Sequence, residues 1–317
     1  GYFFDAKKNR TRPTLIFLFA HLLQDAALSS QTNKPLAQVE GQATLTARHR
    51  LLSELAELIH VSMTLHNNVR DENPAAAPAA AAEPARKPSD RHRAESLPSS
   101  LSLDGLTAMM GKKLVLGGDL LFARVVVGLH ALRDHYVTEL MTVTLEQSLM
   151  GEVLSTGNDG TLEAYENIAF CRTASLMAHA LQATAVLSGA DKHVQRVAFD
   201  IGKYTYLCGR VRDDIRAYRK AKPSLLTNGE PIVLGNAVVA AATAKDAALR
   251  AQVAAYAKEG KAFDLWEAAA AVDAEAAAEA MARDYAKLAV RAVMSLPECK
   301  WRDGMVKLVE HILVRAK

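Results

Sequence analysis

The chain has 317 residues, half of them apolar, and it is long enough to bury a sizeable core in one large domain. Its 38 basic and 35 acidic residues are spread without a long basic block, which gives no support to nucleic-acid binding. Three cysteines, Cys171, Cys208 and Cys299, lie far apart without metal-ligand spacing. The cysteines therefore do not indicate a disulfide-bonded fold, and a reducing compartment fits better.

The N-terminal part contains one apolar run, from Leu15 to Leu23, which His21 interrupts. The run has about half of the roughly 20 residues needed to span a bilayer, so we expect no transmembrane segment. Further along, Leu51, Leu55, Leu58 and Leu65 follow each other at spacings typical of a helix packed on a core.

Two later segments, 114–132 and 168–187, are apolar on nearly all sides, which predicts central helices of a bundle larger than four members. Asp119, near the first of them, is expected to cap or anchor a helix end. No segment shows the alternation of a strand. The sequence therefore predicts an all-α protein forming a single large helical bundle over residues 1–317.

Residues 73–100 interrupt this helical pattern. Five prolines, at positions 74, 78, 84, 88 and 98, stand among alanines and charged residues, a composition that cannot bury an apolar face. We interpret this stretch as a long inserted loop. Beyond it, the Ala-rich segment 237–317 is predicted to be helical, with breaks near Gly260 and at Leu296-Pro297.

A series of motifs in fixed order resembles the trans-type polyprenyl diphosphate synthases over nearly the whole chain. The order is more specific than any single motif. In chain order the matching segments are 2–7, Arg12-Pro13, 54–60, 111–114, 118–124, Gly151-Glu152, 172–176 and 213–215. The resemblance implies the all-α isoprenoid (polyprenyl) synthase fold.

Members of that family release pyrophosphate with the help of magnesium, which is held by aspartates of two motifs. Magnesium prefers hard oxygen ligands, so loss of carboxylates weakens such a site. The first motif here reads Asn67-Asn68-Val69-Arg70-Asp71, in which two of the three expected carboxylates are amides. Asn67, Asn68 and Asp71 are thus interpreted as a vestigial metal motif.

The second motif reads Asp213-Asp214-Ile215-Arg216-Ala217, so Asp213 and Asp214 remain and Ala217 replaces the third carboxylate. Arg210 precedes Asp214 by four residues and Arg216 follows Asp213 by three. These spacings allow ion pairs within one helix, and we favour a structural role for both aspartates over metal binding.

The resemblance also implies contacts to substrate diphosphate. Arg12, Arg172 and Thr173 occupy positions where family members bind it, whereas Asn9 and the pair Gly209-Arg210 depart from the family pattern. The arginine pair that follows the first motif in the family is missing. His60 and His66 are six residues apart and do not share a helix face as a zinc pair would.

From these departures we expect no catalytic residue, no bound metal and no cofactor, with magnesium relevant only if activity survives. The chain resembles the non-catalytic subunit of heteromeric mitochondrial decaprenyl or solanesyl diphosphate synthases, which serve ubiquinone biosynthesis. This resemblance implies a homologous catalytic partner, a mitochondrial location on the matrix side, and a dimer face formed by segments 114–132 and 138–149.

Two other hypotheses stay open. The fold could serve as a structural accessory subunit of a large mitochondrial complex, such as the respiratory chain, ATP synthase or ribosome, with unrelated protein partners. Alternatively, a weakly active enzyme could use unusual metals, because some hard oxygen ligands survive.

Overall fold

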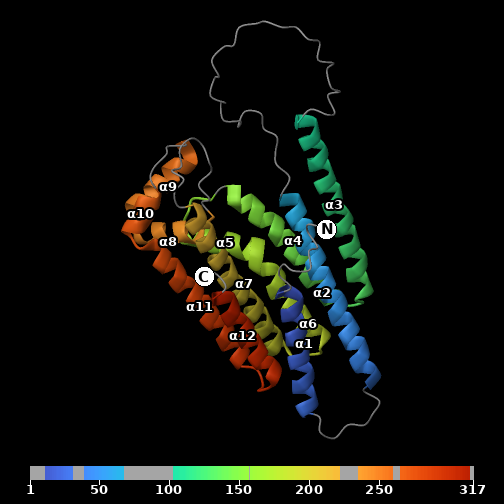
Figure 1. Ribbon diagram of the computed structural model, residues 1–317. Coiled ribbons are helices and arrows are strands. Elements are labelled where there is room, and N and C mark those ends of the chain that lie inside the picture. The colour runs from blue at the N-terminus through green and yellow to red at the C-terminus, as the bar shows by residue number, and fades with distance from the viewer. Residues whose placement is uncertain are drawn as a thin grey trace, which may run out of the picture.

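The computed structural model describes residues 11–30, 39–67, 103–156, 158–221, 235–259 and 265–314. Within these ranges the chain consists of helices without strands, which confirms the all-α prediction. Figure 1 shows the helices gathered into one elongated bundle. The inserted segment 73–100, together with Asn68 and Asp71, lies outside the described residues.

Four long helices form the first half of the bundle: α1 (Thr11–Ser30), α2 (Val39–Asn67), α3 (Leu103–Ala131) and α4 (His135–Thr156). The second half follows as α5 (Leu162–Ala169), a π-helical turn η5 (Phe170–Ala174), α6 (Ser175–Leu187), α7 (Lys192–Ala221), α8 (Ala237–Lys245), α9 (Ala247–Glu259), α10 (Leu265–Ala271), α11 (Ala274–Met294) and α12 (Lys300–Val314).

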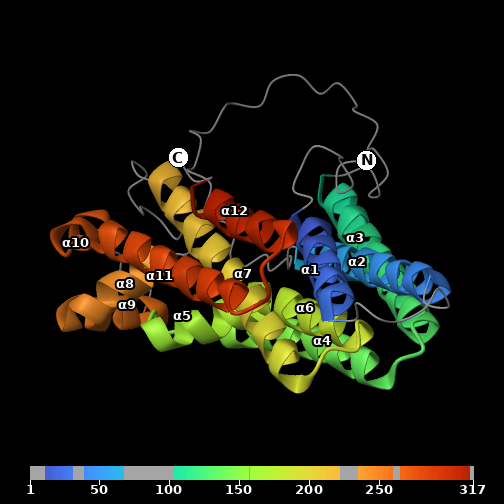
Figure 2. The same cartoon turned by 90° about the horizontal axis from the view of Figure 1, so that it is seen from below.

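Helix α6 lies at the centre of the larger core. It packs against α1, α2, α4 and α7, and nearly all of its residues are buried, as its all-round apolar sequence predicts. The view from below in Figure 2 shows α6 enclosed by these neighbours. A side chain at Gly202 of α7 would place its Cβ 2.3 Å from the Met177 carbonyl oxygen, so glycine is needed for this close helix contact.

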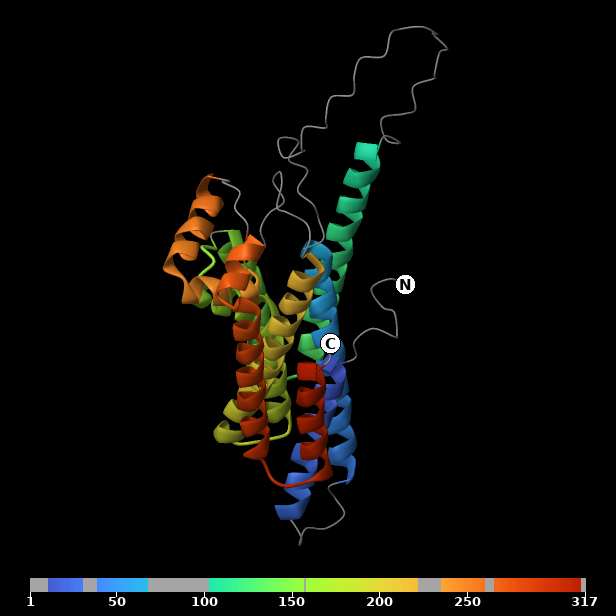
Figure 3. The same ribbon diagram turned by 60° about the vertical axis from the view of Figure 1, so that its left-hand side comes forward.

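Helix α7 connects this core to a second one built with α5, α8, α9, α10 and α11. Its longest contact is with α11, alongside which it runs in Figure 3. The break predicted at Leu296-Pro297 is confirmed, because α11 ends at Met294 and α12 begins at Lys300. Helix α9 ends at Glu259, directly before Gly260, which lies outside the described residues.

The prediction that segment 114–132 forms a central helix is wrong. Helix α3 packs against α2 and has only a small contact with α4, so it lies at the edge of the bundle (Figure 1). By length and composition alone, its part Gly111–Ala131 is the one helix among the described residues that could cross a membrane. Asp119 lies in the middle of α3, so the expectation of a helix cap there is also wrong.

Candidate functional site

The second aspartate motif lies on α7, and its two aspartates have opposite environments. The Asp213 side chain is 68% exposed, whereas that of Asp214 is 6% exposed. Consecutive helical residues point about 100° apart, which turns Asp213 to solvent and Asp214 toward α5 and α8. Ala217 is exposed and offers no ligand.

Asp214 is held by donors from three helices. Its carboxylate forms an ion pair with Arg210 at 3.0 Å, and its Oδ2 accepts hydrogen bonds from the Tyr165 hydroxyl at 2.9 Å and the Ala237 N–H at 3.2 Å. Asn236 adds a fourth link, because its Nδ2 donates to the Asp214 carbonyl oxygen at 3.0 Å. Asp214 thereby joins α5 and α7 to the beginning of α8.

Local sequence explains why α8 begins at this carboxylate. The Asn236 side chain caps α8 by accepting a hydrogen bond from the Val238 N–H at 2.8 Å. The next residue, Ala237, then presents a free first-turn N–H to Asp214, where a negative charge is favoured by the helix dipole. Burial raises the pKa of Asp214 above its ordinary value, while Arg210, Tyr165 and the Ala237 N–H act in the opposite direction.

Asp213 is paired as well. Its carboxylate lies 3.2 Å from Arg216 on the same helix. The two intrahelical ion pairs expected from spacing, Arg210 with Asp214 and Arg216 with Asp213, are therefore confirmed.

The first motif is described only at Asn67, the last residue of α2. Its Nδ2 donates to Glu152 Oε1 at 2.8 Å, and the same oxygen lies 2.9 Å from Arg172 Nε. Glu152 thus bridges Asn67 of the first aspartate motif and Arg172, a predicted diphosphate contact. The Gly151-Glu152 motif is visible in the sequence, but its pattern does not predict this bridging role.

Arg172 and Thr173 lie on the π-helical turn η5, a kind of insertion that is frequent at functional sites. The turn approaches α4 closely, because a Cβ at Gly151 would lie 2.5 Å from Arg172 Cγ and 3.1 Å from Arg172 N. Thr173 is half-buried beside it. The contact between η5 and α4 directs Arg172 toward Glu152.

Arg12, the third predicted diphosphate contact, is also paired. Its Nε lies 2.8 Å from Oε1 of Glu57, and its Nη2 donates to Oε2 of the same carboxylate at 3.3 Å. The pair is two-pronged and mostly shielded from solvent, with side chains that are 16% and 31% exposed. It ties α1 to α2.

Four arginines in or beside the substrate and metal motifs each pair with a carboxylate from the chain itself. The four pairs are Arg12–Glu57, Arg172–Glu152, Arg210–Asp214 and Arg216–Asp213. No group of three or more His, Cys, Asp or Glu side chains in the described ranges could hold a metal ion. These residues do not fit the magnesium that a diphosphate-releasing site requires, since the one exposed aspartate is paired and its neighbour is enclosed by donors.

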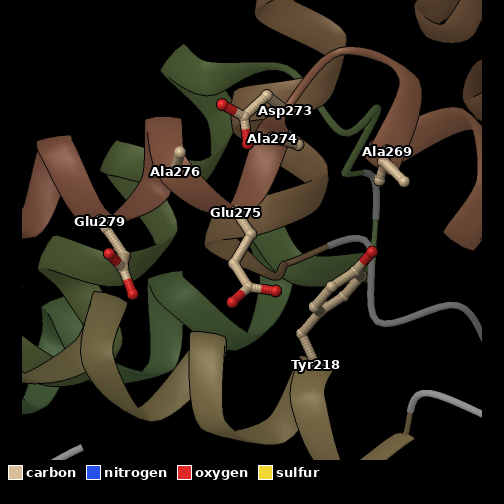
Figure 4. Close-up of a pocket in the computed structure, with 8 residues that line it drawn as sticks. Tyr218, Ala269, Asp273, Ala274, Glu275, Ala276 and Glu279 are labelled. Atoms are coloured by element: carbon tan, nitrogen blue, oxygen red, sulfur yellow. The ribbon is translucent and has the colours of Figure 1, made fainter.

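A cavity of about 310 Å³ lies elsewhere, between the end of α7 and the α10–α11 junction (Figure 4). Tyr218, Asp273, Glu275 and Glu279 line it, together with small alanine side chains. Both glutamates are bound by Arg219, at 2.8 and 2.7 Å. The cavity contains none of the residues predicted from the motifs.

Comparison with known proteins agrees with the motif order and the fold. The family model described as polyprenyl synthetase matches residues 105–276, which is more than half of the chain. The chain belongs to the polyprenyl synthetase family. A crystal structure of a decaprenyl diphosphate synthase from Rhodobacter capsulatus aligns with a TM-score of 0.70 at 22% identity, covering 100% of this chain and 88% of that one.

Curated members of the family are similar along the sequence. A decaprenyl-diphosphate synthase from Dictyostelium discoideum is 24% identical over 323 residues, covering 100% of this chain but 62% of its own length. The mitochondrial solanesyl-diphosphate synthase 1 of Oryza sativa subsp. japonica is 29% identical over 231 residues, covering 71% of this chain and 48% of its own length. The chain thus spans about half to three fifths of these relatives.

Proposed function

We propose that this chain is a non-catalytic member of the polyprenyl synthetase family, which acts as a subunit of a heteromeric polyprenyl diphosphate synthase. The observation that carries the proposal is the environment of Asp214. A residue that the family resemblance places in a metal motif here joins three helices through four hydrogen-bonding or ionic contacts.

Electrostatics supports the absence of catalysis. Departure of pyrophosphate requires positive charge that is not already neutralised, because catalysis of such reactions depends mainly on stabilising the negative charge that develops. Here four arginines face four carboxylates of the same chain, so their charges sum to zero before any substrate arrives. A diphosphate would have to displace Glu57 from Arg12 and Glu152 from Arg172.

The names of relatives support a proposal about the partner and the location. The names of similar proteins describe decaprenyl and solanesyl diphosphate synthases, and that of the rice protein places it in mitochondria. We therefore propose a catalytic chain of the same family as the partner, a product that serves ubiquinone side-chain synthesis, and a location in the mitochondrial matrix.

The proposal is tested by expressing this chain, a catalytic polyprenyl synthase from the same organism, and both together. With an allylic diphosphate, isopentenyl diphosphate and magnesium, we expect no product from this chain alone. We also expect the two chains to copurify and to give more product than the synthase alone. A magnesium-dependent product from this chain alone that Asp213→Asn abolishes would refute the proposal, whereas copurification with unrelated subunits would favour a structural accessory role.

A further inference from the structure

The first half of α7 carries a row of basic residues with one aromatic ring among them. Lys192, Arg196, Phe199 and Lys203 follow at spacings of four, three and four residues, which places them within an arc of about 60° on the helix. Lys192 and Arg196 are exposed, whereas Phe199 and Lys203 are half-buried. We call these four residues the basic row of α7. None of them belongs to the motifs described above.

The three cations of the basic row have no ion-pair partner among the described residues. Asp200 follows Arg196 by four residues and precedes Lys203 by three, yet it pairs with neither of them within the described part of the chain. Asp191 is engaged at the beginning of α7, where its Oδ1 accepts a hydrogen bond from the Val194 N–H at 2.9 Å. Unlike the four motif arginines, the basic row thus keeps its positive charges available for a partner.

Aromatic rings from neighbouring helices hold both lysines of the row in place. Lys192 Nζ lies 4.3 Å from the centre of the Tyr136 ring of α4. Lys203 Nζ lies 5.6 Å from the centre of the Phe170 ring of η5, and this ring is 6.1 Å from that of Phe199. Such cation–π contacts fix a flexible side chain before a partner arrives, which lowers the entropy cost of binding.

Two classes of anionic partner fit this surface poorly. Single-stranded nucleic acid binds by stacking its bases on aromatic faces, but lysines already lie over the rings of Tyr136 and Phe170. A helix that binds a lipid surface combines basic residues with apolar side chains that enter the membrane. The exposed large apolar side chains of the described residues lie on α3, α4, α11 and α12, so the basic row has none beside it on α7.

We infer that the basic row binds an acidic helix of a partner protein. At 1.5 Å per residue, Lys192 and Arg196 are about 6 Å apart along α7, and Arg196 and Lys203 are about 10.5 Å apart. Carboxylates at positions i, i+4 and i+11 of a second helix have the same spacing, and an apolar residue at i+7 would then pack against Phe199. A partner helix in the opposite direction would carry the same residues in reverse order. Complementary charges set the register of such a pair, and the apolar contact adds affinity.

This inference does not depend on the proposed function, because the basic row contains no motif residue and the acidic helix could belong to a catalytic synthase or to another protein. Copurification and product formation test the proposed function. Peptide binding tests the basic row alone, so the two can fail separately.

Fluorescence anisotropy of labelled peptides tests the inference on the full chain. The probes are alanine-based helical peptides of about 20 residues, one with Glu at i, i+4 and i+11 and Leu at i+7, the other with the reverse order. We expect one of them to bind at least about tenfold more tightly than a peptide of equal composition whose glutamates lie on different faces.

Variants of the full chain locate the binding surface. Arg196→Glu should weaken binding of the preferred peptide about tenfold or more. Lys307→Glu, an equal change of charge at an exposed residue of α12, should leave it within about twofold. Circular dichroism of both variants shows whether the fold is kept.

Charge exchange gives a further test that does not rely on loss alone. A peptide with Lys in place of its central Glu should bind Arg196→Glu more tightly than it binds the unaltered chain. Equal binding of ordered and rearranged peptides, or equal effects of Arg196→Glu and Lys307→Glu, would overturn the inference. So would oligouridine or phosphatidylserine vesicles that bind through Arg196 when neither peptide does, because the row would then serve RNA or a membrane.

Discussion

The guanidinium of Arg210 lies 3.0 Å from the buried carboxylate of Asp214, one turn further along α7. This pair stands at the place where α5, α7 and α8 meet, with Tyr165 and Ala237 as further donors to the same carboxylate. Asp214 therefore has a structural task that its exposed neighbour Asp213 lacks. The two adjacent aspartates offer a matched comparison.

Replacement of Asp214 by Asn should lower the free energy of unfolding by about 2–4 kcal/mol, because it leaves Arg210 facing a neutral group in a mostly buried place. Asp213→Asn should change it by about 0.5 kcal/mol or less, since that ion pair is exposed. Urea unfolding of both variants measures the difference. Equal effects of the two substitutions would contradict the structural role of Asp214.

Removal of the Glu152 charge should release Arg172. We expect Glu152→Gln to bind pyrophosphate about tenfold more tightly than the unaltered chain in calorimetric titration without magnesium, because a charge-assisted contact becomes available. Glu146→Gln changes an exposed residue of the same helix and should have no effect. The gain should disappear in a Glu152→Gln, Arg172→Gln double variant, and its persistence there would mean that pyrophosphate binds elsewhere.

Stability should depend on pH through His60. Burial, with a further contribution from Arg12, lowers the pKa of His60 from its ordinary value of 6.5 to about 4. Between pH 6.5 and 4, His60 is therefore protonated in the unfolded chain but stays neutral in the folded chain. The free energy of unfolding should fall over this range by on the order of 3 kcal/mol.

The contribution of His60 can be separated from that of other groups. Burial also lowers the pKa of His49, which adds to the loss of stability in acid. His60→Gln should make the decline between pH 6.5 and 4 shallower, whereas His193→Gln, at an exposed position, should leave its slope unchanged. Identical slopes for all three proteins in denaturant titrations would show that His60 titrates normally.

The contact between α6 and α7 can be tested at Gly202. An alanine there would press its Cβ against the Met177 carbonyl oxygen, so we expect a loss of about 2 kcal/mol or more in thermal or urea unfolding. Gly117→Ala is the control, since its nearest atom would be Leu65 Cδ1 at an ordinary 3.6 Å. Because alanine favours a helix more than glycine does, Gly117→Ala should raise the free energy of unfolding by about 0.5–1 kcal/mol. A change of the same sign in both variants would contradict the packing described.

Sequence patterns predicted the fold and part of the site. Motif order indicated the family, and residue spacing identified the ion pairs of Asp213 and Asp214 because both partners lie on one helix. The contact of Asp214 with Tyr165 and the bridge of Glu152 between Asn67 and Arg172 could not be predicted this way. These contacts join residues that are 49, 85 and 20 positions apart and depend on how separate helices pack.

Helix α3 shows a different limit of sequence patterns. An apolar surface on all sides is expected both for a helix enclosed by its own bundle and for one that meets another molecule. Composition therefore placed segment 114–132 in the centre, whereas residues such as Val127 are exposed at the edge. On α4 the expected face over 138–149 exposes the acidic residues Glu139 and Glu146, and the exposed large apolar residues begin only at its last residue, Leu149.

The retention of divalent ions tests the central claim most directly. Manganese can replace magnesium, and its paramagnetic resonance signal reports the free ion when the full chain is titrated with pyrophosphate present. Because the site carboxylates are engaged by arginines, we expect the free signal to match that of a protein-free solution containing the same pyrophosphate. Stoichiometric uptake of manganese by the chain, lost in Asp213→Asn, would contradict the account.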